Sequence, residues 1–338
     1  MKRKTKKNLA FALIAAMLLL VACGGGNVES AAQQLPEPTE PQVLQPAVQE
    51  TPEPVEPAES IEPTRPTTDR EGYPITLPYE INTILSIGPS NTEILVALGL
   101  ADNIVAVDMF SADVEGLPPG ISTALSIVGL DAEYVINLMP DVIFVTGMAR
   151  MGGEDDPLAP VSEMGISVIF MPTSTSIAAI IEDIQFMAAV VDATDAGETI
   201  VANMQSEIEE IRQIAETITE PRTVYFEVAP MITFGTGTFL HEMIELVGAI
   251  NIFADQDGWA SVTGEAVLEA NPDVILTSAD FLEDPIADIT ERPGFGVITA
   301  VQNGDVFQID TATSSRANHN IVTALWQIGQ TVFPSYFQ

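Results

Sequence analysis

Cysteine, histidine and lysine are scarce in this chain of 338 residues, and each scarcity excludes a kind of site. The one cysteine, Cys23, excludes an internal disulfide framework, an iron–sulfur cluster and a zinc site with several thiolate ligands. Two histidines, His241 and His319, are too few for a histidine-rich metal centre. No lysine follows Lys7, and the seven later basic residues are all arginines. We therefore predict neither a metal site nor an intrinsic cofactor.

Acidic residues dominate the charge, because 48 Asp and Glu stand against 12 Lys and Arg and give a net charge of −36. Nucleic-acid phosphates need Lys and Arg to neutralise them, so this balance excludes nucleic acid as a partner. The chain is nonetheless 46% hydrophobic, which is enough to bury a large core. Its length is typical of about two domains.

The first 22 residues have the pattern of an export signal. Five basic residues precede a charge-free apolar run from Leu9 to Val21, which is too short for a membrane span of about 20 residues. The sequence Leu-Val-Ala-Cys23 then resembles a bacterial lipoprotein signal, in which a peptidase cuts before the cysteine and the sulfur carries a lipid. An ordinary secretory signal with an incidental cysteine is the alternative. We expect residues 1–22 to be a signal peptide and the chain to be lipid-anchored on the extracytoplasmic face of the cell membrane.

Residues 23–80 have the composition of a disordered stalk. Eleven prolines fall between Asn27 and Glu80, with repeated Glu-Pro pairs and few large apolar side chains. Such a segment cannot bury a core, and it reaches about 3.1 Å per residue where it is polyproline-like. A proline-rich partner-binding motif is the alternative.

Beyond residue 80, short apolar runs alternate with amphipathic helical patterns, which is typical of an α/β fold. Residues 83–87 and 104–107 are predicted strands. Between them, Ser90 and Glu93 form a capping-box pattern for a helix that ends at Gly99.

One segment of this α/β pattern recurs at a distance. Residues 133–143 and 265–275 share Glu, Val, Pro, Asp, Val and Ile at identical spacing, with a helix before the proline and a strand after it. A common helix–Pro-Asp–strand junction would explain the Pro-Asp pair but not the glutamate seven residues earlier. We predict a structural repeat, with an N-terminal α/β lobe over residues 81–193 and a C-terminal α/β lobe over residues 220–338.

A long helical stretch lies between the two predicted lobes. Residues 177–191 form one predicted helix, and Asp195 with Glu198 caps the next, whose apolar residues recur at helical spacing. This second helix, placed within residues 194–219, would span about 36 Å over roughly 24 residues at about 1.5 Å per residue, enough to bridge two lobes. Packing within one lobe is the alternative.

The order of these motifs resembles one known family. Ile-Gly-Pro-Ser-Asn-Thr-Glu-Ile (87–94), the two repeat segments with the long helix between them, and Gly-Asp-Val-Phe-Gln-Ile-Asp (304–310) are similar to the periplasmic-binding proteins for iron–siderophore, haem and cobalamin. The resemblance covers residues 81–338. It implies two Rossmann-like lobes joined by a single long bridging helix, with the ligand cleft between them. It also implies a receptor that delivers a ferric siderophore, corrinoid or haem to an ABC importer, formed by a permease dimer and its ATPase. We expect the receptor to be a monomer.

Candidate ligand contacts come from the loops at the carboxyl ends of the strands, where α/β proteins bind ligands. Aromatic and methionine faces there suit a bulky flat or chelated ligand. The candidates are Phe110, Arg150, Met231, Trp259, Phe281 and Arg316. Trp259 lies six residues before Glu265, as does a ligand-facing tryptophan in the cobalamin receptors that the chain resembles. Arg316 matches the first arginine of the family pattern Ser-Arg-Pro-Gly-Pro-Arg. The second arginine is absent here, which argues against a strongly anionic siderophore.

The glutamates of the repeat have a further role that the resemblance implies. Related receptors present one glutamate on each lobe to arginines of the two permease subunits, and Glu133 and Glu265 occupy equivalent places in the two segments. Ordinary solvated glutamates at helix starts are the alternative.

No enzyme is predicted, because the sequence has no Gly-x-Ser-x-Gly elbow and no Walker-type phosphate loop. In His241-Glu242-Met-Ile-Glu245, a glutamate stands where a zinc-protease helix needs its second histidine, so we expect His241 to lie on a helix surface. His319 either faces the ligand or lies on a solvated loop. A lipid-anchored enzyme or sensor that reuses the same fold is the alternative function.

Overall fold

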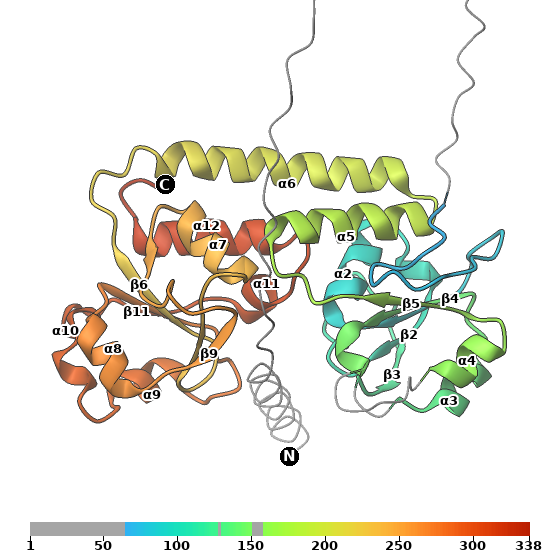
Figure 1. The fold of residues 1–338 in the computed structure, drawn as a ribbon, viewed down its shortest axis with the longest axis horizontal. Coiled ribbons are helices and arrows are strands. Elements are labelled where there is room, and N and C mark those ends of the chain that lie inside the picture. Colours follow the sequence, from blue (N-terminus) through green and yellow to red (C-terminus); the bar gives the residue numbers. More distant parts are fainter. Residues whose placement is uncertain (1–64, 128–129, 151–157) are drawn as a thin grey trace, which may run out of the picture.

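The structure is a computed structural model that describes residues 65–127, 130–150 and 158–338. The predicted signal peptide, Cys23 and the stalk up to residue 64 lie outside the described residues. Figure 1 shows two lobes side by side, with one long helix lying across both. No helix within the described ranges is long and apolar enough to cross a membrane.

The N-terminal lobe is built on a five-stranded parallel sheet, in the order β3-β2-β1-β4-β5. Its strands β1 and β4 are almost completely buried, because helices cover the faces of a parallel sheet. The strands are β1 (Ile84–Ile87), β2 (Ile104–Asp108), β3 (Ser122–Leu125), β4 (Val142–Thr146) and β5 (Ser167–Met171). The helices are α2 (Pro89–Ala97), α3 (Ala132–Leu138), α4 (Ala159–Glu163) and α5 (Ile177–Val190), with 3-10 turns η1 (Ala101–Asn103) and η2 (Gly147–Arg150).

The C-terminal lobe repeats this arrangement on a four-stranded parallel sheet, in the order β11-β10-β6-β8, beside an antiparallel pair of β7 and β9. The strands are β6 (Thr223–Glu227), β7 (Ile232–Phe234), β8 (Ile250–Asn251), β9 (Trp259–Ser261), β10 (Val274–Thr277) and β11 (Val306–Gln308). The helices are α7 (Phe239–Leu246), α8 (Gly264–Ala270), α9 (Pro285–Thr290), α10 (Thr299–Asn303), α11 (Thr311–Ser315) and α12 (Ile321–Val332), with a 3-10 turn η3 (Phe295–Val297).

Helix α6 (Thr194–Ala215) joins the lobes, as the sequence predicts. Its 22 residues span about 33 Å. The helix packs against α5 of the N-terminal lobe and against α7 and α12 of the C-terminal lobe (Figure 1). Gly197 permits the close approach to α5, because a Cβ atom there would lie 2.5 Å from the Cβ atom of Ala188. The expected Asp195 cap is wrong: the N-cap is Ala193, which makes no side-chain capping bond, and Asp195 lies in the first turn.

The predicted repeat is confirmed at the level of single hydrogen bonds. Helices α3 and α8 both end in a left-handed residue, Met139 and Asn271, each with φ of 44°. After the proline, the Asp141 carboxylate accepts hydrogen bonds from the backbone and hydroxyl of Thr83, at the start of β1. Asp273 makes the same pair of contacts with Thr223, at the start of β6. The Pro-Asp element therefore fastens each central strand to its neighbour.

The predicted stalk ends earlier than residue 80. Residues 65–80, which we call the strap, lie against the N-terminal lobe. Arg65 Nη2 donates to the Val190 carbonyl at 2.7 Å, and Arg70 Nε donates to Asp183 at 2.7 Å. The apolar side chains of Ile75 and Leu77 pack against the main core. Sequence composition missed the strap because its prolines and acids match those of the preceding stalk.

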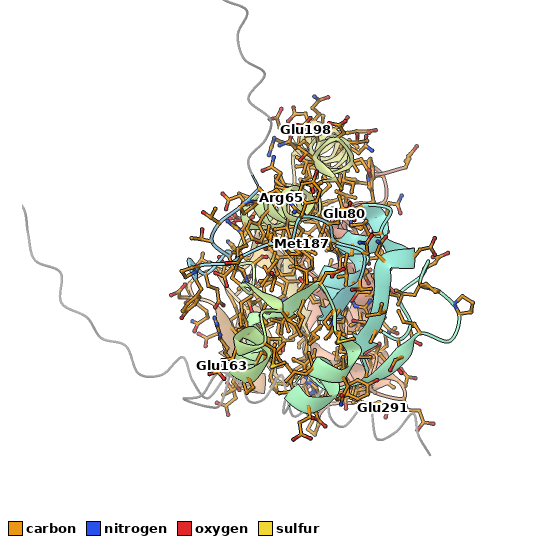
Figure 2. All side chains as sticks on the ribbon, turned by 90° about the vertical axis from the view of Figure 1, so that its right-hand side faces the viewer. Arg65, Glu80, Glu163, Met187, Glu198 and Glu291 are labelled. Atoms are coloured by element: carbon orange, nitrogen blue, oxygen red, sulfur yellow. The ribbon has the colours of Figure 1, made fainter. Side chains whose placement is uncertain are left out.

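Acidic side chains cover the outside of the N-terminal lobe. Figure 2 places Glu80, Glu163 and Glu198 at the periphery, whereas Met187 of α5 lies inside and is fully buried. The net charge is compatible with an apolar core, because among the described acids only Asp69, Asp108, Asp183 and Glu227 are buried.

Candidate functional site

A cavity of about 340 Å³ lies between the lobes, within the size range of small-molecule sites. Its walls come from the carboxyl ends of β1, β4 and β5 on one lobe and of β6 and β10 on the other, as expected for α/β lobes. The N-terminal lobe contributes Gly88–Asn91, Ile94, Ile127, Thr146, Met148, Met171–Ser174 and Asp183. The C-terminal lobe contributes Val228, Ile232, Phe239, Trp259, Ser278, Asp280, Phe281, Thr311 and Ser315–Ala317.

Three of the six predicted ligand residues line this cavity: Trp259, Phe281 and Arg316. Trp259, on β9, packs edge-on against the buried ring of Phe234, with centroids 6.3 Å apart. Phe234 thus holds the indole in place from behind. Trp259, Phe281 and the thioethers of Met148 and Met171 give the wall a polarisable, largely apolar character.

The other three predicted ligand residues do not line the cavity. Phe110 packs against a buried cluster of the N-terminal lobe that includes Leu85, Ile87 and Val145. Arg150 places its guanidinium 3.3 Å from the ring centre of Phe170 and forms an ion pair with Glu71 of the strap. Met231 packs into the core of the C-terminal lobe. These side chains therefore hold their loops against the lobes.

Several wall residues were missed by the sequence analysis. Met171 is the last residue of β5 and Pro172 follows it directly, so the rule that ligands bind at strand ends could have found both. Phe239 at the start of α7 and Asp183 inside α5 carry no local signal, because only the tertiary packing brings these helices to the cavity.

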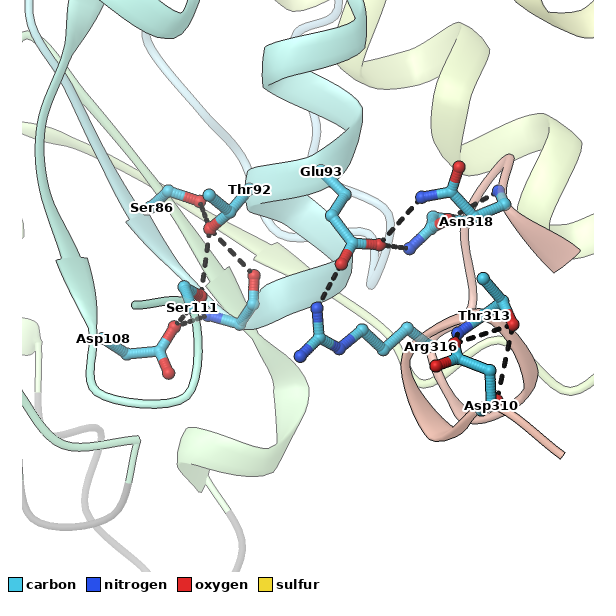
Figure 3. Close-up of polar contacts among 11 residues, drawn as sticks. Ser86, Thr92, Glu93, Asp108, Ser111, Asp310, Thr313, Arg316 and Asn318 are labelled. Carbon is cyan, nitrogen blue, oxygen red and sulfur yellow. Dashed lines mark hydrogen bonds and ion pairs between the residues drawn. The ribbon is translucent and has the colours of Figure 1, made fainter. Parts of the chain in front are cut away.

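The loop at the amino end of α2 is fixed by a buried carboxylate. Asp108, at the end of β2, accepts a hydrogen bond from the backbone of Gly88 at 2.7 Å and another from the hydroxyl of Ser111 (Figure 3). Gly88 has φ of 115° and is the N-cap of α2, so the predicted Ser90–Glu93 capping box is wrong. The network orients residues 88–91 at the cavity wall.

Glu93 instead reaches across to the C-terminal lobe. Its carboxylate forms an ion pair with Arg316 and accepts hydrogen bonds from the side-chain amides of Asn318 and Asn320 (Figure 3). The contact joins α2 to the loop between α11 and α12 beside the cavity.

Asp183 is a buried carboxylate in the cavity wall. Burial raises the pKa of Asp183, and hydrogen bonds from Ser174 and Arg70 oppose that rise. Arg70 belongs to the strap and also pairs with Glu182. The strap therefore contributes the countercharge of a wall residue.

Neither histidine contributes to the cavity wall. The expectation for His241 is wrong, because the side chain is buried and its Nδ1 lies 3.3 Å from the amide nitrogen of Asn251. His319 has a buried Nδ1 with no hydrogen-bond partner among the described residues, and burial lowers the pKa of His319. In the part of the chain that the structure describes, no three His, Cys, Asp or Glu side chains gather as a metal site would require.

Glu133 and Glu265 are both exposed and lie in the first turns of α3 and α8. Asp131 and Thr263 cap these helices with side-chain hydrogen bonds three residues along the chain. The two glutamates thus occupy equivalent positions on the two lobes.

Comparison with known proteins gives one consistent result. The sequence pattern of the family described as periplasmic binding protein matches residues 84–313. An uncharacterized ABC transporter substrate-binding lipoprotein of Bacillus subtilis, YvrC, is 28% identical over 278 residues, which cover 80% of this chain and 86% of that protein. A vitamin B12-binding protein of Photorhabdus laumondii is 27% identical over 198 residues, which cover 58% of this chain and 70% of that protein. A possible iron-binding, periplasmic solute-binding protein from Staphylococcus epidermidis has a crystal structure similar to this one, with a TM-score of 0.67 and 25% identity, covering 75% of this chain and 99% of that chain.

Proposed function

The chain belongs to the periplasmic binding protein family, and from this premise we propose that it is the solute receptor of an ABC importer, lipid-anchored on the extracytoplasmic face of the membrane. The observation that carries the proposal is the cavity of about 340 Å³ between two lobes joined by one helix. The Bacillus relative, named as a substrate-binding lipoprotein of an ABC transporter, supports it. The partners of the receptor are then a permease dimer and its ATPase.

The proposed ligand is a bulky metal chelate or tetrapyrrole, such as a corrinoid, a haem or a ferric hydroxamate. The rings of Trp259 and Phe281 and the thioethers of Met148 and Met171 offer stacking and dispersion contacts to a flat ligand. The names of two relatives, a vitamin B12-binding protein and a possible iron-binding protein, favour the same classes.

Tryptophan fluorescence tests the ligand class. The chain has two tryptophans, and Trp326 lies on α12 with its Nε1 donating to Glu207 at 3.2 Å. A Trp326→Phe variant therefore isolates the signal of Trp259. Titration with cyanocobalamin, haemin and a ferric trihydroxamate should give saturable quenching by at least one of them, with micromolar or tighter affinity, about −8 kcal/mol.

Phe281→Ala should weaken that binding about tenfold or more, because a large buried aromatic contact is lost. Met164 is exposed and is not a wall residue, so Met164→Ala is the matched control and should bind like the parent. Absence of quenching by all three ligands would refute the proposed ligand class.

Glu133 and Glu265 are proposed to dock the receptor on arginines of the permease. Their equivalent, exposed positions on the two lobes suit a dimeric partner, and charge pairing would orient docking without contact to the ligand. Glu133→Ala with Glu265→Ala should leave ligand affinity unchanged and reduce uptake, more so together than singly. Exposed Glu163→Ala is the control. If the double variant supported uptake at the parental level with receptor limiting, the docking role would be refuted and both residues would be ordinary solvated glutamates at helix starts.

Cys23 is the proposed site of lipidation. Cys23→Ala should release the chain from the membrane fraction. Cys23→Ser, which replaces the sulfur by oxygen with little change in size, should do the same. Membrane retention of both variants would refute the anchor.

A further inference from the structure

The positive charge at the cavity wall is already neutralised from within the protein. Arg316 is the only basic residue among the described residues of the wall. Its guanidinium forms an ion pair with Glu93 (Figure 3). The side chain of Glu93 is only 10% exposed, against 24% for Arg316. Glu93 itself does not belong to the wall. The arginine therefore borders the cavity while its partner lies behind it.

The same carboxylate accepts hydrogen bonds from two further side chains of that loop. The amides of Asn318 and Asn320 both donate to Oε2 of Glu93, the second at 3.2 Å, while Arg316 donates to Oε1. An anionic group that enters the cavity must therefore compete with a desolvated carboxylate held by three donors.

The remaining charges of the wall are unfavourable to anions as well. Asp183 and Asp280 are both wall residues. Asp183 is paired with Arg70, which lies outside the wall. Arg316, the one basic residue of the described wall, is already paired with a carboxylate, so the described wall presents no other cation to an anionic ligand.

We propose that Glu93 acts as a built-in anion that neutralises Arg316 and thereby selects against anionic ligands. This inference rests on the proposed receptor function and specifies the charge of its ligand, which is neutral at the group that approaches Arg316. Glu93 is thus a specificity-determining residue that acts through Arg316 without touching the ligand. Replacement of Glu93 by glutamine should free the arginine for a ligand carboxylate.

Two matched pairs of probes test this specificity. The first pair is cyanocobalamin and its monocarboxylic acid derivative, and the second is haemin dimethyl ester and haemin. The parent should bind the neutral member of a pair about tenfold more tightly, and Glu93→Gln should raise the affinity of the anionic member about tenfold while the neutral member changes less than about threefold. Glu71→Gln, which removes a carboxylate paired with Arg150 off the wall, is the control and should leave both affinities unchanged. An equal change for both members, or no change, would show that Glu93 is only a structural link and would overturn the proposal.

A second measurement is independent of the ligand class. The NMR signals of the arginine guanidinium groups, assigned with an Arg316→Gln variant, are recorded during titration with inorganic phosphate. Phosphate should shift the Arg316 signal in Glu93→Gln and leave it unshifted in the parent. Equal shifts in both proteins, or none in the variant, would overturn the proposal. If no chelate or tetrapyrrole binds, the proposed ligand class fails, whereas this titration still decides the role of Glu93.

Discussion

Removal of the Asp141 carboxylate should destabilise the N-terminal lobe by about 2 kcal/mol. The carboxylate accepts three hydrogen bonds, from the backbone of Asn82 at 2.8 Å and from the backbone and hydroxyl of Thr83, both at 2.9 Å. Hydrogen bonds to a charged group contribute about 1.5–3 kcal/mol each when desolvated, but water replaces part of this at a half-buried site. We therefore expect Asp141→Ala to lower the free energy of unfolding by about 2 kcal/mol, less than the full contribution of three desolvated hydrogen bonds.

The pH dependence of that contribution follows from the same contacts. Burial raises the pKa of Asp141, but the hydrogen bonds from Asn82 and Thr83 outweigh burial, so the net shift of the pKa is downward. A carboxylate with a lowered pKa in the folded state stabilises the fold at pH values above its ordinary pKa, and this stabilisation is lost as the pH falls through the lowered value. Asp141→Asn should thus lose less stability than the parent on acidification below pH 4.

Thermal and urea unfolding, followed by circular dichroism, measure the effect. A loss of about 2 kcal/mol should lower the melting temperature by about 4–8 °C. Asp273→Ala should give a matching loss in the C-terminal lobe, visible also in fluorescence because Trp259 and Trp326 both lie there. Exposed Asp102→Ala is the control. If Asp141→Ala were no less stable than Asp102→Ala, the repeat element would have no stabilising role and the reasoning would be refuted.

Two further predictions concern local features of the fold. Burial lowers the pKa of His319, so the unfolded chain binds the proton more readily and the free energy of unfolding should fall as the pH drops below about 6.5. Urea unfolding between pH 7 and 5 should therefore show a weaker pH dependence of stability for His319→Gln than for the parent. An equal pH dependence in both proteins would contradict this. Gly235→Ala should lower the free energy of unfolding by at least about 3 kcal/mol, because the new Cβ atom would lie 2.1 Å from the carbonyl oxygen of Gln256. Gly296→Ala is the control, because its new Cβ atom would have nothing within 4 Å. Equal melting temperatures of the two variants would contradict the steric argument.

The elements of the fold that could be predicted are those encoded by local sequence. The helix–Pro-Asp–strand repeat was recognisable because the left-handed residue, the proline and the strand-fastening Asp141 lie within a few positions of one another. Helix α6 was recognisable because its buried residues recur at helical spacing. Both patterns can be recognised in the sequence without knowing which surface the element packs against.

The candidate site was predicted only in part, because side-chain direction depends on distant contacts. Several loops at strand ends line the cavity, yet the loop with Phe110 does not, and Arg150 turns away to stack on Phe170. Glu93 matched a capping box by spacing, but its partners lie more than 220 residues away in the chain. His241 matched a surface position on α7, but the β8 residue Asn251 covers it. No local pattern specifies such contacts.

The strap and the cavity wall share one ion pair. Arg70 joins the segment that leads to the stalk to Asp183, a buried acid of the cavity wall. A chain shortened to residue 81 would leave Asp183 without its cation, and an unpaired buried charge is strongly destabilising. The receptor domain therefore begins no later than Arg70, although the sequence resemblance begins only at residue 81. The receptor domain thus includes the strap.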